Sequence, residues 1–174
     1  MSGLRFRFLQ FPWKTITKDA FDGTMTVAKF LLVFHVSDTY ICTPTVTYGA
    51  SMLPTINSTG DLLLADRLSA RFGRIRRGDI IIARSPENPR KIVTKRVMGM
   101  EGDQVTFLVD PGNINSCKSV TVPKGHVWIQ GDNTYVSNDS RKYGAIPYGL
   151  IEGKAFFRVW PLENFGSLSP GSHP

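Results

Sequence analysis

The sequence has little cysteine and little histidine. Its 174 residues include only Cys42, Cys117 and three histidines. Two cysteines in different contexts form neither a disulfide framework nor a cysteine-based metal site. Histidines without cysteine pairs also lack zinc-type spacing. We therefore expect no metal ion and no cofactor, and we expect both cysteines to be structural or incidental.

The sequence also has no long apolar run that is free of charge. Its most apolar stretch, residues 25–46, reads MTVAKFLLVFHVSDTYICTPTV and contains Lys29, His35 and Asp38. A spanning helix needs about 20 mostly apolar residues, and a charge at mid-bilayer is costly. We expect a single retained membrane span here, and a buried or interfacial helix is the alternative.

Residues 1–24 interleave basic and aromatic side chains, as segments at a membrane interface do. Asp19 and Asp22 argue against a simple transit peptide, because transit peptides are poor in acidic residues. Residues 1–46 are therefore predicted to form an N-terminal membrane-anchoring segment.

The excess of basic residues gives a formal net charge of +7. Such a charge permits nucleic acid or an anionic membrane surface as a neighbour, and by itself does not choose between them. The one dense basic run, RFGRIRR at 71–77, is more often a solvated loop. A basic β module that binds nucleic acid would need aromatic residues interleaved with Lys and Arg on a β face. We keep that module as an alternative and expect no nucleic-acid partner.

Short β-rich runs separated by Gly, Pro, Asp and Asn fill the chain from residue 47 onward. They predict a mostly β domain at 47–162, antiparallel and folded on itself. The end of the chain, which includes GSLSPGSHP, has the composition of a disordered tail, assigned to 163–174. The runs are 61–68, 78–85, 91–100, 104–110, 119–132 and 153–162.

The stretch GASMLPT at 49–55 places Ser51 on a loop stiffened by proline. A serine hydroxyl is a poor nucleophile until a base takes its proton. His35 lies in the apolar segment and His173 in the tail, so His126 is the one histidine left in the β domain. His126 is the less favoured alternative for the base, because the sequence predicts that it is a turn residue at the start of a strand.

Lys95 in KIVTKRVMG is the other possible base. Strand alternation places Val93, Lys95 and Val97 on one face, where the lysine either reaches solvent at a sheet edge or is buried. Burial lowers a lysine pKa by disfavouring the ammonium, so a buried Lys95 would take a serine proton.

The polar stretch GDNTYVSNDSRKYG at 131–144 bears on the same site. The Ser137 hydroxyl is able to orient an amine, and Asp139 and Arg141 are spaced to pair. An unpaired Asp139 near Lys95 would raise the lysine pKa, so its pairing with Arg141 favours the neutral base. The alternative is a polar loop with a surface ion pair.

Three stretches of the sequence resemble, in order, the three conserved boxes of the type I signal peptidases. They are SMLPT (51–55), VTKRVMG (93–99) and GDNTYVSNDSRKYG (131–144). The resemblance covers most of residues 44–161. It implies a serine–lysine dyad on a mostly β fold. The expected fold is a signal-peptidase-type folded antiparallel β domain with one N-terminal membrane-associated helix.

Carried over box by box, the resemblance implies that Ser51 is the nucleophile and Lys95 the general base. The Ser51 N–H would form part of the oxyanion hole. Many bacterial relatives have a serine where this chain has Gly49, so the second donor would be a backbone N–H. Ser137 would position Lys95. The remaining implied roles are a brace formed by Asp139 and Arg141, and a substrate loop shaped by Met52 and Pro54.

Within the family the sequence looks like the mitochondrial inner-membrane branch. That branch implies precursor polypeptides with hydrophobic sorting signals as substrates, a catalytic domain facing the intermembrane space, and a heterodimer with a sister subunit. The alternatives are a bacterial or secretory-type signal peptidase, a self-cleaving repressor-type peptidase and an inactive scaffold subunit. No helix-turn-helix pattern supports the repressor type, and the presence of both Ser51 and Lys95 argues against the scaffold.

Overall fold

The structure, a computed structural model, describes residues 13–109 and 116–168. The chain divides into two compact units, Met1–Ser37 and Asp38–Pro174. The basic and aromatic residues before Trp13, and His173, lie outside the described residues. The second unit begins at Asp38, before the boundary after residue 46 that the sequence predicts.

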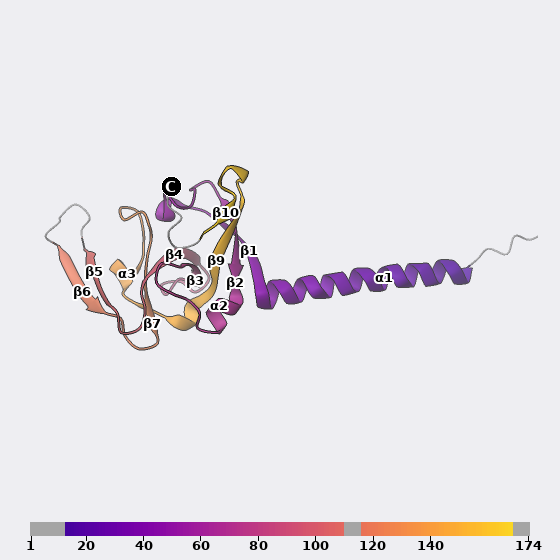
Figure 1. Cartoon of the computed structure of the whole chain (residues 1–174), viewed down its shortest axis with the longest axis horizontal. Coiled ribbons are helices and arrows are strands. Elements are labelled where there is room, and N and C mark those ends of the chain that lie inside the picture. The colour runs from indigo at the N-terminus through magenta and orange to yellow at the C-terminus, as the bar shows by residue number, and fades with distance from the viewer. Residues whose placement is uncertain (1–12, 110–115, 169–174) are drawn as a thin grey trace, which may run out of the picture. The chain divides into compact units, whose positions relative to one another are not determined.

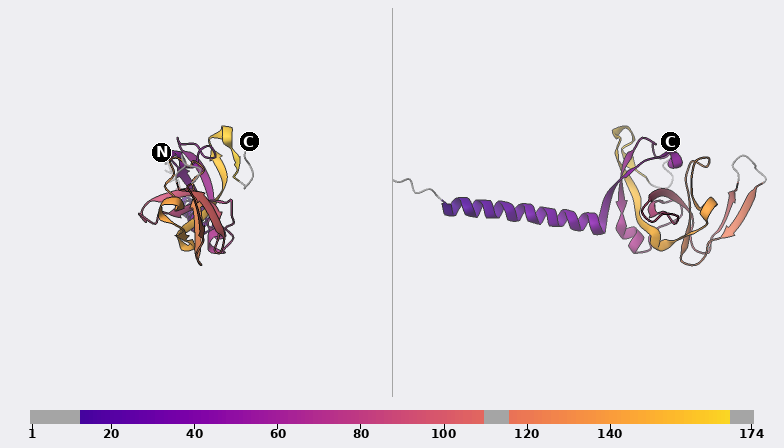
Figure 2. Two further views of the ribbon diagram at one scale, coloured as in Figure 1. Left: turned by 90° about the vertical axis from the view of Figure 1, so that its left-hand side faces the viewer. Right: turned by 180° about the vertical axis from the view of Figure 1, so that it is seen from behind.

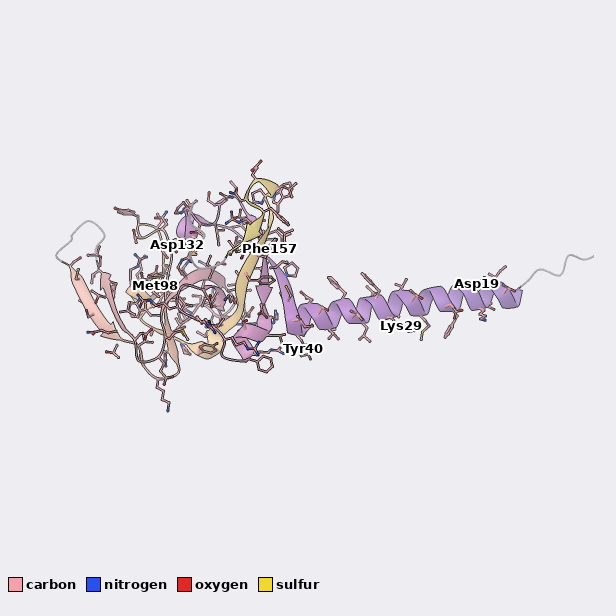
Figure 3. The ribbon with its side chains drawn as sticks, viewed as in Figure 1. Asp19, Lys29, Tyr40, Met98, Asp132 and Phe157 are labelled. Atoms are coloured by element: carbon pink, nitrogen blue, oxygen red, sulfur yellow. The ribbon has the colours of Figure 1, made fainter. Side chains whose placement is uncertain are left out.

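The first unit contains α1 (Trp13–Val36), drawn with Asp19 and Lys29 labelled in Figure 3. Its described side chains, from Thr15 to Val36, are exposed, and they include the apolar run Phe30–Phe34. Among the described residues, no helix combines the length and the apolar character that crossing a membrane requires. The helix was expected, and no spanning segment is found at 25–46.

The second unit is built on an eight-stranded sheet in which every pairing is antiparallel (Figures 1 and 2). Its order is β1-β2-β9-β3-β4-β7-β8, and β10 pairs with β9. A separate hairpin joins β5 and β6. The mostly β, antiparallel fold predicted from the sequence is confirmed. The strands are β1 (Cys42–Thr47), β2 (Asp61–Asp66), β3 (Ile80–Arg84), β4 (Ile92–Gly99), β5 (Gln104–Leu108), β6 (Cys117–Thr121), β7 (His126–Gln130), β8 (Ile146–Pro147), β9 (Ile151–Trp160) and β10 (Gly166–Ser167).

Short helical segments join the strands. The α-helices are α2 (Arg67–Arg71) and α3 (Ser140–Tyr143). Tighter turns are η2 (Ala50–Met52), η3 (Tyr148–Leu150) and η4 (Leu162–Asn164), and the π-helical turn η1 (Ser37–Ile41) precedes β1.

Two sequence expectations about the ends of the β domain need correction. Residues 42–47, which had been assigned to the anchoring segment, form β1 and pair with β2 from Cys42↔Asp66 to Thr47↔Asp61. Threonine and valine favour a strand there, and Pro44 is tolerated because β1 lies at the sheet edge. Residues 163–168, expected to be disordered, contain part of η4 and β10, and Leu168 packs in a buried cluster. Residues 169–174 lie outside the described residues.

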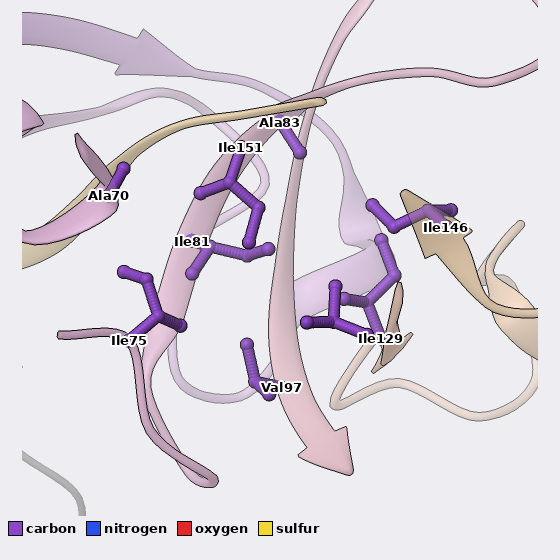
Figure 4. Packing of buried hydrophobic residues seen from close by; sticks show 9 residues of the cluster. Ala70, Ile75, Ile81, Ala83, Val97, Ile129, Ile146 and Ile151 are labelled. Carbon is purple, nitrogen blue, oxygen red and sulfur yellow. The ribbon is translucent and has the colours of Figure 1, made fainter. Parts of the chain in front are cut away.

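The central strand β3 has buried residues on both of its faces. Ile81 and Ala83 pack in the larger cluster, where Figure 4 shows them with Val97 of β4 and Ile129 of β7. Ile80 packs in a second cluster with Met52 from the serine loop. A strand buried on both faces reads as a continuous apolar run, which explains the sequence IIIA. Packing therefore fixes both β4 and the serine loop against the same strand.

Candidate active site

A short loop after β1 positions Ser51. Gly49 has φ of 106°, a conformation that glycine adopts without strain, and its N–H donates to the Ser58 carbonyl at 3.2 Å. Met52, the next residue after Ser51, is 2% exposed and anchors the loop in the core. Leu53 is extended with ψ of 144°, as the residue before a proline must be. The loop is thus held on both sides of the serine.

Lys95 lies on the buried face of β4. Its burial alternates with that of its neighbours, since Lys95, Val97 and Gly99 are buried while Arg96 and Met98 are partly exposed. Lys95 retains 4% exposure, so it is not the solvated edge lysine that the sequence also allowed. Its Nζ lies 2.7 Å from Ser51 Oγ and 3.1 Å from the Thr94 carbonyl oxygen. The fold therefore joins two residues 44 positions apart in a direct hydrogen bond.

Burial lowers the pKa of Lys95 from its ordinary value of 10.5 to about 8. The carboxylate of Asp139 opposes this shift, while the positive charges of Lys91 and Arg141 add to it. A lysine with a pKa near 8 is partly neutral at neutral pH, and a neutral amine is able to accept a serine proton.

Asp139 and Arg141 form a two-point ion pair beside the dyad. Arg141 Nε lies 2.9 Å from Asp139 Oδ1, and Arg141 Nη2 lies 2.6 Å from Oδ2. Asp139 is fully buried and also accepts a hydrogen bond from the Gly131 N–H at 2.8 Å. Burial by itself would raise the pKa of Asp139, but these hydrogen bonds lower it below its usual range. The carboxylate is therefore ionised and committed to Arg141.

Ser137 is buried against Gly131, and a hydrogen bond from its hydroxyl to Asp139 helps to lower the pKa of that carboxyl. The expected hydrogen bond between Ser137 and Lys95 is not observed. A Cβ placed on Gly131 would lie 2.3 Å from Ser137 Oγ and 2.4 Å from the Ser51 carbonyl oxygen. Only glycine at 131 allows the serine loop and the Ser137 loop to approach this closely.

Three further contacts at the site were not anticipated from the sequence. The Asn133 N–H donates to the Ser51 carbonyl at 3.0 Å, which ties the serine loop to the turn after β7. Arg96, adjacent to Lys95, forms an ion pair with Asp132 at 2.7 Å, and Thr55 donates to the same carboxylate at 2.6 Å. The turn Gly131–Asn133 and Arg96 are evident in the sequence, but nothing in the sequence indicates that Arg96 contacts this turn.

His126, the alternative base, lies at the start of β7, where its Nδ1 is 2.9 Å from the Lys124 carbonyl oxygen. It does not line the groove described next. Among the described residues, no three His, Cys, Asp or Glu side chains are grouped to hold a metal.

A groove of about 740 Å³ opens beside the dyad. One wall is formed by Thr45, Val46 and Thr47 of β1, and the other by the chain from Ile92 to Lys95 of β4. Among the strands that the structure describes, β1 lies at the sheet edge and pairs only with β2. β4 pairs with β7 only from Arg96 onward, so its first residues have a backbone edge that β7 does not cover. Two strand edges thus border the groove that contains Ser51.

Comparison with known proteins identifies relatives that match most of the chain. The sequence profile described as "Signal peptidase, peptidase S26" matches residues 22–116 and 109–160. The Arabidopsis thaliana mitochondrial ATP-independent inner membrane protease subunit 1a is 54% identical, covering 95% of this chain and 99% of its own. The human mitochondrial inner membrane protease subunit 1 is 46% identical, covering 81% of this chain and 84% of its own.

More distant matches include subunit 2 of the zebrafish (Danio rerio) mitochondrial inner membrane protease, which is 39% identical over 72% of this chain and 68% of its own. A crystal structure of a signal peptidase I from Enterococcus faecalis matches with a TM-score of 0.40 and 26% identity, over 46% of this chain and 95% of its own. The resemblance read from the three boxes, including the likeness to the mitochondrial inner-membrane branch, is confirmed by the Arabidopsis relative and by the family profile. The chain belongs to the signal peptidase family of proteases, peptidase S26.

Proposed function

We propose that this protein is a serine endopeptidase that removes membrane-bound sorting segments from precursor proteins at the mitochondrial inner membrane, with Ser51 as nucleophile and Lys95 as general base. One observation carries the proposal: the Nζ of a 4% exposed lysine lies 2.7 Å from the Ser51 hydroxyl. The names of the plant and human relatives support the location and the reaction.

In the first half of the reaction, Ser51 Oγ attacks the carbonyl carbon of the scissile peptide while Lys95 Nζ takes the hydroxyl proton. The tetrahedral intermediate then collapses and breaks the carbon–nitrogen bond. Lys95 gives the proton to the departing amine, which leaves with the downstream part of the substrate. The upstream part remains attached to Ser51 as an ester.

In the second half, a water molecule attacks the ester carbon and Lys95 takes one of its protons. Collapse of this second intermediate breaks the bond to Ser51 Oγ, and the proton returns from Lys95 to the serine. The enzyme is restored, and no redox step, metal or cofactor is required for the balance of atoms and charge.

The neighbouring groups have supporting roles in this proposal. The Ser51 N–H stabilises the oxyanion, and a second backbone donor takes the place of the side chain that Gly49 lacks. The buried hydroxyl of Ser137, a neighbour of Asp139, turns to the amine of Lys95 once substrate is bound. The ion pair between Asp139 and Arg141 keeps a carboxylate from holding the lysine in its charged form.

The groove suits an extended polypeptide. A chain lying between β1 and the first residues of β4 would hydrogen-bond to two strand edges at once, with side chains alternating between the groove walls. Met52 and Pro54 form the part of the loop next to Ser51, where they shape the site that receives the substrate. A folded substrate would not fit between the edges, so the cleaved segment must be unfolded locally.

The relatives include both subunit 1 and subunit 2 of mitochondrial inner membrane proteases. We extend the proposal to a heterodimer with a sister subunit, with the catalytic domain in the intermembrane space. A secretory or bacterial-type role with the same dyad is the alternative, and it predicts processing of secretory rather than mitochondrial precursors.

The proposal is tested with purified wild-type protein, Ser51→Ala and Lys95→Met, using a detergent-solubilised mitochondrial precursor and the sister subunit where needed. Each variant should lose activity by at least about 10⁴-fold while remaining folded. For the wild type, kcat/KM should fall about tenfold per pH unit below the Lys95 pKa of about 8 and level off above it.

The matched control is Lys118→Met, which removes an exposed lysine of β6 that does not line the groove. Its activity should stay close to that of the wild type. If Lys95→Met retained activity, Lys95 would not be the base, and His126→Gln would then be the next variant to measure.

A further inference from the structure

The loop between α2 and β3 carries a dense positive charge that the dyad does not use. Residues 71–77 include four exposed arginines and the exposed Phe72, and we call this segment the arginine loop. The arginines are Arg71, Arg74, Arg76 and Arg77. They concentrate four positive charges in seven residues, while the formal net charge of the entire chain is +7.

The positive charge of this loop is not neutralised within the domain. None of the four guanidinium groups forms an ion pair with a carboxylate in the part of the chain that the structure describes. The acidic residues that flank the loop have other partners. Asp66 caps α2 through the Leu68 N–H, and Asp79 pairs with Lys154 at 2.8 Å.

The arginine loop is held in a defined conformation. Ile75 at its middle is 3% exposed and packs in the larger core cluster, as Figure 4 shows. The Arg74 N–H donates to the Ser69 carbonyl at 2.8 Å, and the Arg76 N–H donates to Asp79 at 2.8 Å. The arginines therefore project from a fixed base and are not spread along a free chain.

Aromatic side chains lie among these charges. Phe72 is 66% exposed, with the Arg74 guanidinium 5.6 Å from its ring centre. Tyr40, labelled in Figure 3, is 49% exposed, and the Arg71 guanidinium lies 5.0 Å from its ring centre. The domain thus presents guanidinium groups together with two exposed rings.

We propose that the arginine loop, with Tyr40, is a docking surface for a bilayer that contains anionic phospholipids. Guanidinium groups bind phosphate oxygens in two-point geometry, and aromatic rings favour the headgroup level of a membrane. Nucleic acid fits less well, because base stacking needs open ring faces and a guanidinium covers a face of each ring. This surface lies in the β domain and is separate from the proposed peptidase chemistry.

The test measures binding of the full-length protein to vesicles by co-sedimentation. One set of vesicles contains equimolar phosphatidylcholine and phosphatidylserine, and the other contains phosphatidylcholine alone. The variant is Arg74→Gln/Arg76→Gln/Arg77→Gln. The matched control is Arg90→Gln/Lys118→Gln/Lys124→Gln, which removes three exposed charges elsewhere and leaves the same net charge.

The arginine variant should bind anionic vesicles on the order of 10²-fold more weakly than wild type, since each basic residue near such a surface contributes roughly fivefold. The control should lose much less, and binding to neutral vesicles should be alike for all three proteins. Equal losses in the variant and its control would overturn the proposal, because net charge alone would then explain the binding.

Hydrogen exchange on the same full-length protein provides a second measurement. It reports on the arginine loop directly, even if another segment contributes most of the vesicle binding. Anionic vesicles should slow amide exchange at residues 72–78, and Phe72→Ser should reduce that protection. Absence of protection would overturn the proposal. If polyglutamate slowed exchange there and vesicles did not, the surface would instead fit an acidic protein partner.

Discussion

At the scale of single residues, Lys95 combines a charge-bearing side chain with a core position. It is 4% exposed, and its pKa falls to about 8 because burial disfavours the ammonium. The same burial that makes the amine a better base must therefore destabilise the folded state while the lysine is protonated.

This cost has a definite dependence on pH. Between about 8 and 10.5 the unfolded chain holds the Lys95 proton and the folded protein does not, so the free energy of unfolding rises with pH through this window. Below about 8 both states are protonated and the full cost, about 3 kcal/mol at roughly 1.36 kcal/mol per unit, is present.

Lys95→Met, which we expect to be inactive, should consequently be more stable than wild type near neutral pH, by about 1–3 kcal/mol. The gain should shrink above roughly pH 10, where the wild-type lysine is neutral in both states. Urea unfolding at several pH values measures this difference. An unchanged or lower stability of Lys95→Met at neutral pH would contradict the buried-ammonium account.

Gly131 gives a second prediction at this scale. In Gly131→Ala the new Cβ would lie 2.3 Å from Ser137 Oγ and 2.4 Å from the Ser51 carbonyl oxygen, so the two loops must separate. We expect kcat/KM to fall on the order of 10²-fold, as for a displacement of about 1 Å in a catalytic group. Gly149→Ala is the control, because nothing lies within 4 Å of a Cβ there. Equal activity of both variants would show that the close approach is unimportant.

At the scale of elements, a buried ion pair links β2 and β9 to the end of the serine loop. Arg158 of β9 is 6% exposed, and its Nε lies 3.1 Å from the fully buried Asp61 of β2. Arg158 Nη2 also donates to the Thr55 carbonyl, and Asp61 accepts from the Asn57 N–H at 3.2 Å. The two strands thus hold the chain a few residues after Ser51.

Arg158→Met should lower the free energy of unfolding by about 3–5 kcal/mol, because it leaves Asp61 charged and buried without its partner. Asp61→Asn/Arg158→Met should recover part of this loss. Arg84→Met is the contrasting control, since Arg84 pairs with Glu152 at the surface with its side chain 55% exposed, and an exposed pair contributes at most about 1 kcal/mol. Similar losses for Arg158→Met and Arg84→Met in chemical denaturation would contradict this assignment.

Element prediction from sequence succeeded where the apolar pattern was strong and failed where two patterns overlapped. The runs at 78–85 and 91–100 contain β3 and β4. By contrast, only the five residues of η1 separate β1 from the apolar helix, so the sequence pattern does not mark where the anchoring segment ends and the threonine-rich strand begins. The segment 163–168 was assigned to the disordered tail by composition, yet β10 pairs with β9 there and Leu168 packs in the core.

At the scale of the whole molecule, the two units differ in how they are stabilised. The described side chains of α1 are exposed, whereas the β domain has buried clusters around β3. Stability of the β domain is therefore expected to come from its own core.

Removal of residues 1–37 should change the free energy of unfolding of the β domain by no more than about 1 kcal/mol, since exposed side chains contribute little. The truncated protein should keep its activity on a short soluble peptide and lose activity on a membrane-embedded precursor. Denaturation curves and the two cleavage assays measure these effects. A β domain that failed to fold without residues 1–37 would show that the helix is part of the core.

The sequence by itself determined the β architecture, the N-terminal helix and the three boxes, because these depend on local patterns and short motifs. The resemblance to the three boxes also predicted that Ser51 and Lys95 act together, although their separation along the sequence does not say how close they lie in space. Only the tertiary structure decided that Lys95 is buried and lies 2.7 Å from Ser51, that Gly131 admits two loops at close contact, and that Asn133 holds the serine carbonyl. These features depend on contacts between distant segments, and such contacts exist only once the antiparallel sheet has brought its strands together.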